Sequence, residues 1–71
     1  MSQTETVRVY AVEGMTCRHC VLSVTEEVAE VAGVRDVDVE LSSGRLVVRG
    51  TGVNDDAVRS AVAEAGYEVV A

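Results

Sequence analysis

Residues 7–31 read VRVYAVEGMTCRHCVLSVTEEVAEV and contain a predicted strand, a cysteine-bearing loop and a predicted helix. Over 7–13, apolar residues alternate with polar or mixed ones, which is the period of a β-strand. The alternating apolar positions are Val7, Val9 and Ala11. After the loop, valines recur at spacings of three and four residues and so form one apolar stripe along a helix. These valines are Val21, Val24, Val28 and Val31.

Beyond this stretch the chain turns back into strands. We expect the helix to end near Ala32, with Gly33 in the left-handed conformation that commonly follows a helix end. Alternating apolar residues predict a second strand over 34–41, and residues 46–49 predict a third. Ser42-Ser43-Gly44 supplies a tight turn between them, so these two strands should be antiparallel neighbours.

A second helix and a last strand complete the pattern. Asn54 is a preferred N-cap residue, and the acidic residues Asp55 and Asp56 follow it where they interact favourably with the helix dipole. Gly66 is expected to end the helix, and residues 67–70 to form the last short strand. The predicted buried side of this helix consists of Val58, Ala61, Val62 and Ala65.

The resulting order, βαββαβ, is the split-βαβ arrangement. We therefore predict an α+β, ferredoxin-like sandwich, with a four-stranded antiparallel sheet and both helices on one face. A chain of 71 residues has room for a single domain, with an expected ordered core over about 5–71. Its two cysteines are too close in sequence to stabilise the fold as a disulfide, so the hydrophobic core must do so.

Composition excludes several classes of partner. Twelve acidic residues against six arginines and no lysine give a formal net charge of −6, which leaves no basic surface for nucleic acid or anionic lipid. No apolar run approaches the roughly 20 residues that span a bilayer, so direct membrane insertion is not expected. The polar residues 1–6 do not resemble a secretion signal. We expect a cytoplasmic protein that is not an enzyme.

The loop between the first strand and the first helix carries the chemistry. It reads Gly14-Met15-Thr16-Cys17-Arg18-His19-Cys20, with Cys17 expected on the loop and Cys20 in the first helical turn. Helix N-terminal amides and the positive charge of Arg18 favour thiolates, which are the metal-binding form of cysteine. Two soft thiolates suit Cu(I). A structural zinc site takes four ligands, and besides the two cysteines this chain has one histidine, His19.

These residues resemble a known family. The motif of residues 14–20, the βαββαβ pattern and the terminal Gly66-Tyr67-Glu68-Val69 are similar to the heavy-metal-associated domains, most closely to the free-standing bacterial copper chaperones of the CopZ type. The resemblance implies a carrier that delivers Cu(I) by ligand exchange to the metal-binding domain of a copper-exporting P-type ATPase. It also implies that Tyr67 lies near the metal. Thr16 stands where zinc-handling members often carry aspartate, which favours copper.

Alternatives remain beside this interpretation. A C-x-x-C motif that opens a helix is also typical of thioredoxin-like redox proteins, although those place a cis-proline beside the dithiol and this chain has no proline. A carrier of zinc or mercury on the same fold is a related possibility. For Met15 we favour a flexible core filler over a thioether ligand. His19 is expected to be solvated in a monomer without metal, and to become a ligand only in a copper-bridged homodimer at high loading.

Overall fold

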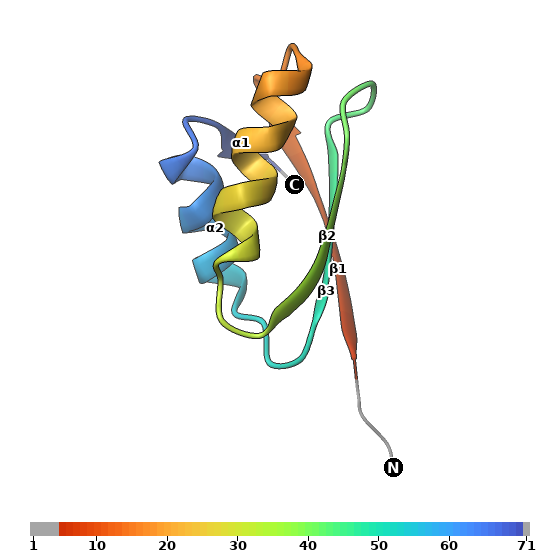
Figure 1. Cartoon of the computed structure of the whole chain (residues 1–71), viewed down its shortest axis with the longest axis vertical. Coiled ribbons are helices and arrows are strands. Elements are labelled where there is room, and N and C mark those ends of the chain that lie inside the picture. Colours follow the sequence, from red (N-terminus) through yellow and green to blue (C-terminus); the bar gives the residue numbers. More distant parts are fainter. Residues whose placement is uncertain (1–4, 71) are drawn as a thin grey trace.

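The computed structural model describes residues 5–70, and the first four residues and Ala71 lie outside this part of the chain (Figure 1). The elements follow the predicted order. They are β1 (Thr6–Glu13), α1 (Arg18–Ala29), β2 (Val34–Glu40), β3 (Arg45–Gly50), α2 (Asp55–Glu64) and β4 (Glu68–Val69).

The strands form one four-stranded sheet in the order β2-β3-β1-β4, and every neighbouring pair is antiparallel. Both helices pack against the same face of this sheet, and the other face has no helix on it (Figure 1). This arrangement confirms the predicted α+β, ferredoxin-like sandwich. The loop that carries the cysteines lies at the same end of the molecule as the turn between β2 and β3 (Figure 1).

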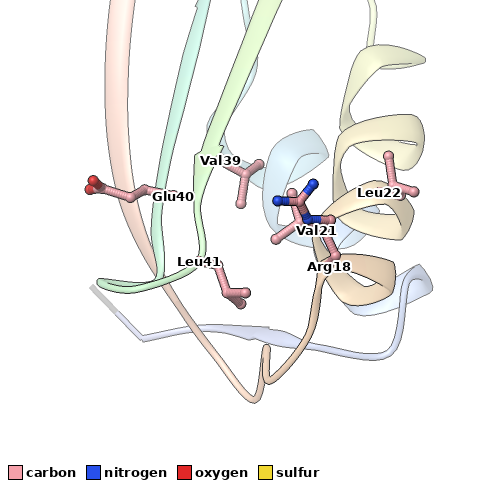
Figure 2. Close-up of a pocket in the computed structure, with 6 residues that line it drawn as sticks. All are labelled: Arg18, Val21, Leu22, Val39, Glu40 and Leu41. Atoms are coloured by element: carbon pink, nitrogen blue, oxygen red, sulfur yellow. The ribbon is translucent and has the colours of Figure 1, made fainter.

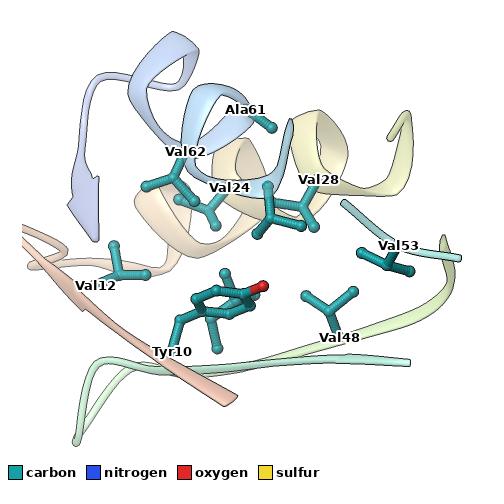
Figure 3. Close-up of a cluster of buried hydrophobic side chains, with 10 residues drawn as sticks. Tyr10, Val12, Val24, Val28, Val48, Val53, Ala61 and Val62 are labelled. Atoms are coloured by element: carbon teal, nitrogen blue, oxygen red, sulfur yellow. The ribbon is translucent and has the colours of Figure 1, made fainter. Parts of the chain in front are cut away.

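The core lies between the sheet and the two helices (Figure 3). Most of its buried side chains are valines, which compensates for the lack of phenylalanine and tryptophan. The buried set consists of Tyr10, Val12, Val24, Val28, Leu46, Val48, Val53, Val58, Ala61 and Val62. The stripe predicted along α1 is centred correctly, because Val24 and Val28 are fully buried and Val21 and Val31 lie at its half-buried margin.

β1 packs on the helices with one of its two faces, and this is not the face on which valines recur at every second residue. Val7 and Val9 are 56% and 59% exposed, whereas Tyr10 and Val12 are buried. The alternation therefore predicts the strand correctly but not which face enters the core. Tyr10 enters because its ring fills the core while its hydroxyl donates a hydrogen bond to Asp55 Oδ1 over 2.8 Å.

The predicted end of the first helix is wrong by about a turn. The helix ends at Ala29 and Glu30 is its C-cap, so Gly33 does not directly follow it. Gly33 has φ +89, and a Cβ there would collide with the carbonyl oxygen of Thr51. The amide of Thr51 donates to the Gly33 carbonyl over 2.9 Å, so glycine is needed for this close backbone approach.

The second half of the chain agrees with expectation at its helix. Asn54 caps α2, and its side-chain oxygen accepts a hydrogen bond from the amide of Ala57. The last strand is shorter than predicted, because β4 pairs with β1 only at Glu68 and Val69. Within residues 5–70, no helix is both long and apolar enough to cross a membrane.

Candidate metal-binding site

The two cysteines lie where β1 gives way to α1. Cys17 is the N-cap residue of α1, with extended backbone (φ −154, ψ 169), and Cys20 belongs to the first turn of the helix. Both are free thiols, and their sulfur atoms are 3.4 Å apart. This separation is well beyond a disulfide bond of about 2.05 Å. The arrangement presents two reduced sulfurs side by side at the surface.

The surroundings favour the thiolate of Cys20. Its pKa falls from 9.0 to about 6, chiefly because the hydroxyl of Tyr67 donates a hydrogen bond to the sulfur. Backbone hydrogen bonding from Thr16 and the side chain of Cys17 lower the pKa further. The same contact with Cys20 raises the pKa of the Tyr67 hydroxyl. At neutral pH the pair therefore presents a nucleophilic, anionic sulfur without the help of a metal.

Tyr67 reaches the cysteine loop because β4 pairs with β1. The ladder runs through Val12↔Val69 and Glu13↔Glu68, so the residues that precede β4 lie beside those that follow β1. The amide of Tyr67 donates to the carbonyl of Val62 over 3.1 Å, which ties its backbone to the end of α2. Its half-buried side chain packs against the core cluster.

Arg18 is not among the main causes of the lowered pKa of Cys20, so the predicted effect of its charge on the thiols stays a prediction. Its side chain lines a groove of about 570 Å³ between α1 and the end of β2 (Figure 2). The groove is walled mainly by apolar side chains, and two of these, Leu22 and Leu41, are 56% and 38% exposed. The groove thus opens an apolar surface beside the cysteine loop.

The remaining predicted residues of the motif divide between core and solvent. Met15 is half-buried and packs against the core cluster, which keeps the loop attached to the fold. Thr16 and His19 are exposed. Among residues 5–70, no three histidine, cysteine or acidic side chains gather where they would hold an ion together. The soft donors that the structure places within 3.4 Å of each other in this loop are the sulfurs of Cys17 and Cys20.

The sequence pattern of the heavy-metal-associated domain matches this chain over residues 9–68. The chain belongs to this family. The match runs from β1 to the first residue of β4, so it contains both cysteines and Tyr67.

Relatives of this heavy-metal-associated domain include both free-standing and embedded copies. It is 36% identical over 61 residues to the copper chaperone CopZ of Enterococcus hirae, which covers 83% of this chain and 88% of that protein. It is 39% identical over 64 residues to copper-transporting ATPase 1 of Rhizobium meliloti, but there the chain spans only 8% of the relative's length. A solved CopZ metallochaperone superposes with a TM-score of 0.86 at 31% identity, and covers 92% of this chain and all of that one.

Gly14 is the first residue of the motif of residues 14–20, but the sequence predicts no side-chain contact for it. Its φ is +99, and a Cβ at this position would lie 3.3 Å from Cδ1 of Tyr67. In the sequence Gly14 indicates only the end of a strand. Its contact depends on the pairing of β1 with β4, and the sequence of the loop gives no sign of that register.

Proposed function

We propose that this chain is a cytoplasmic copper chaperone that holds one Cu(I) ion between Cys17 and Cys20 and passes it to a partner protein. The observation that carries the proposal is the pair of free thiols whose sulfurs lie 3.4 Å apart at the start of α1. The extent of the match supports it, because CopZ of Enterococcus hirae is free-standing and is covered over 88% of its length.

The donor set fits Cu(I) as cargo. Thiolates are soft ligands that select this ion, and two of them satisfy it without a third ligand from the chain. The lowered pKa of Cys20 means that one ligand is already deprotonated at neutral pH. Cys17 is exposed and Cys20 half-buried, so a thiolate from a second protein has access to the ion. Transfer then proceeds by ligand exchange, in which sulfurs from both proteins share the ion before the first pair lets go.

We propose a metal-binding domain of a copper-transporting P-type ATPase as the receiving partner. The similarity to 8% of copper-transporting ATPase 1 supports this, because a short segment of that protein resembles 89% of this chain. The apolar groove lined by Arg18, which follows Cys17 in the chain, offers such a partner a surface to contact (Figure 2). Exposed Leu22 on the wall of that groove is available for contact with it.

An anaerobic titration with Cu(I) against a competing chelator tests the proposed cargo, with Zn(II) run in parallel. We expect one tightly bound Cu(I) per chain and much weaker retention of Zn(II), because zinc prefers four ligands. Cys20→Ser should abolish tight binding while the circular dichroism spectrum stays unchanged. Tight binding that survives this substitution would place the site elsewhere. Preferential binding of Zn(II) would identify a zinc carrier, and catalysis of disulfide exchange without metal binding would identify a redox protein.

At copper levels above one ion per chain we expect association. Two sulfurs are the smallest ligand set that holds Cu(I), and the same loop of a second copy would add two more sulfurs that bridge the ions. The two copies would then form a closed dimer with two-fold symmetry. His19 is exposed next to Cys20, so its imidazole is free to join such a cluster as a ligand. Sedimentation velocity with increasing Cu(I) measures this directly. A protein that stays monomeric above one copper per chain contradicts the dimer, and His19→Ala dimers with an unchanged copper count contradict only the ligand role.

A further inference from the structure

The first half of β1 has an uncovered edge on the side where β4 lies. β4 pairs with β1 at Val12 and Glu13. The amide of Val70 then donates to the carbonyl of Ala11 over 2.8 Å. On its other side β1 is paired with β3 from Thr6 to Ala11. Among residues 5–70, no strand therefore pairs with β1 on the β4 side before Ala11.

The backbone groups of two residues point out of this edge. Successive residues of a strand direct their amide and carbonyl groups to alternate sides. The carbonyl of Ala11 points toward β4, and the amide of Val12 points the other way and donates to Gly44 over 2.8 Å. Counting back from Ala11 in steps of two, Val9 and Val7 direct their amides and carbonyls to the uncovered side. Such a row of backbone groups is a template on which another strand pairs.

The side chains of this segment suit a contact between strands. Val7 and Val9 are more than half exposed on the face of the sheet that carries no helix (Figure 1). Arg8 lies between them on the helix side, since it pairs with the buried Val48. The segment has no proline and no register shift against β3, two devices that commonly block an edge. Its backbone is therefore free to pair.

We propose that this edge of β1 pairs antiparallel with the same edge of a second copy of this chain, about a two-fold axis at Val7. Val7 of one protomer then lies opposite Val7 of its partner, and Val9 lies opposite Glu5. The contact uses one surface twice and closes on itself, so it produces a dimer and no larger assembly. The inference goes beyond the proposed function and is independent of it, because no residue of the cysteine loop takes part.

Charge and existing hydrogen bonds select this register among the neighbouring ones. In the proposed register Arg8 faces the uncharged Thr6. A register centred on Arg8 would set two arginines directly opposite each other, and like charges in that position are destabilising. A register centred on Val9 would require the edge of Ala11, which the amide of Val70 already occupies.

The position of the edge decides what the dimer leaves accessible. β1 begins at the end of the molecule opposite the cysteine loop (Figure 1). Both cysteine loops of the dimer therefore stay exposed, and the contact is distinct from the copper-bridged one. Only a few residues of each protomer take part, which is less than the roughly 800 Å² per partner of a standard interface. We expect an association that needs high protein concentration.

Three substitutions test the register. Val7→Lys sets two ammonium groups opposite each other at the axis and should abolish the dimer. Val9→Lys is the matched control, because Val9 is 59% exposed against 56% for Val7 and lies on the same face of the same strand. Its new charge faces Glu5, so the dimer should persist. Val7→Glu should also be monomeric by itself but should form a heterodimer when it is mixed with Val7→Lys, because position 7 meets its own copy.

The measurements use the reduced, metal-free protein, with a reductant and a metal chelator present. Sedimentation velocity follows a concentration series up to about 1 mM, a dissociation constant at the weak end of association. Nuclear magnetic resonance follows the backbone amides in the same samples. We expect the unsubstituted protein and Val9→Lys to dimerise, with concentration-dependent shifts of the amides of Val7 and Val9. Chemical denaturation shows that each variant folds, and if one does not, the amide shifts of the unsubstituted protein decide.

Several results would overturn the proposal. A protein that stays monomeric throughout the series has no such contact. Concentration-dependent shifts that gather at the cysteine loop would place the contact at the other end of the molecule. Equal losses in Val7→Lys and Val9→Lys, or a mixture of Val7→Lys with Val7→Glu that stays monomeric, would show that the axis does not pass through position 7.

Discussion

The two helices of this protein begin in opposite ways. At the start of α2 the side-chain oxygen of Asn54 accepts a hydrogen bond of 3.2 Å from the amide of Ala57, and Asp55 and Asp56 occupy the first turn. At the start of α1 the N-cap is Cys17, whose side chain makes no capping hydrogen bond, and the first turn carries no acidic residue. The N-terminus of α2 thus has a side-chain partner for one of its backbone amides, and the N-terminus of α1 has none.

The N-terminus of α2 is also tied to the sheet. Asp55 accepts hydrogen bonds from the Tyr10 hydroxyl at 2.8 Å and from Arg59 Nε at 3.2 Å. The bond from Tyr10 and then the one from Arg59 lower the pKa of this carboxyl. Burial, followed by the bond to Asp55, raises the pKa of Tyr10 to about 12. The negative charge that the helix dipole favours is supplied here by the protein itself.

The contrast indicates a division of labour between equivalent structural positions. An uncapped helix N-terminus leaves amide donors and a positive dipole end without a partner, which is a small loss of stability. At α1 this loss places anion-stabilising groups beside two thiols, where a thiolate with the metal ion of the proposed function would take the place of a cap. Both helices contribute to the core, but only the helix that begins away from the cysteines has a side-chain cap.

The substitution with the largest expected effect supplies the N-cap side chain that α1 lacks. Cys17→Ser removes one sulfur and supplies a hydroxyl that is among the preferred N-caps, on backbone that already has extended geometry. We expect tight Cu(I) binding to disappear, while the free energy of unfolding of the reduced, metal-free protein rises by about 0.5–1 kcal/mol. Competition titration measures the first effect and urea denaturation the second.

Cys17→Ala is the matched control for this substitution. It lacks both the sulfur and the hydroxyl, so it should lose binding without gaining stability. If Cys17→Ser is no more stable than Cys17→Ala, the start of α1 is not limited by its missing cap, and the contrast between the helices has another origin.

The second substitution removes the N-cap side chain of α2. Asn54→Ala removes the only side-chain cap of α2, and such substitutions cost about 1 kcal/mol of stability. Thermal or urea denaturation should detect this loss, and the Cu(I) affinity should stay the same because α2 begins away from the cysteine loop. A weaker Cu(I) affinity in Asn54→Ala would contradict the separation of the two roles.

The smallest expected effect concerns the thiol. Tyr67→Phe removes the hydroxyl that contributes most to the lowered pKa of Cys20, so the pKa should rise from about 6 toward its ordinary value of 9.0. Ultraviolet absorbance of the thiolate follows this change. Because the two thiols interact, the curve has two steps, and the lower step is the one that should move.

The same shift predicts how stability depends on pH. The pKa of Cys20 is lower in the folded protein than in the unfolded chain, so its thiolate contributes stability fully above about 9 and loses that contribution as the pH falls through about 6. The free energy of unfolding of the metal-free protein should therefore increase as the pH rises from about 6 to about 9. In Tyr67→Phe the increase should be smaller. Identical profiles for the two proteins would remove the hydroxyl as the cause.

The sequence predicts the order of the elements because each has a local cause. Spacing of the valines defines α1, Asn54 with two aspartates defines the start of α2, and Ser42-Ser43-Gly44 defines the hairpin. The position of the cysteines follows, since a motif between a strand and a helix lies at that junction in any fold. The predicted assignment of Cys17 and Cys20 as metal ligands stays a prediction that the Cu(I) titration tests.

What the sequence does not reveal depends on contacts between distant residues. The inward face of β1 is decided by Tyr10, whose partner Asp55 lies 45 positions away. Glycine is needed at position 33 because the backbone of Thr51 approaches it closely. The local sequence pattern predicts a helix end there instead. The groove that Arg18 helps to line forms where α1 meets the end of β2, and these segments are far apart in the sequence.

The outer strand β2 limits how copies of this protein meet. As the edge of the sheet it leaves one row of backbone amides and carbonyls unpaired, a surface on which strands of other chains polymerise. The register shift between Val34 and Asp36 distorts that row, and the exposed side chains of β2 carry a net negative charge, because Asp36, Asp38 and Glu40 outnumber Arg35. Two such edges repel each other. Growth of a fibre by pairing of one β2 edge with another is thus disfavoured along this side of the sheet.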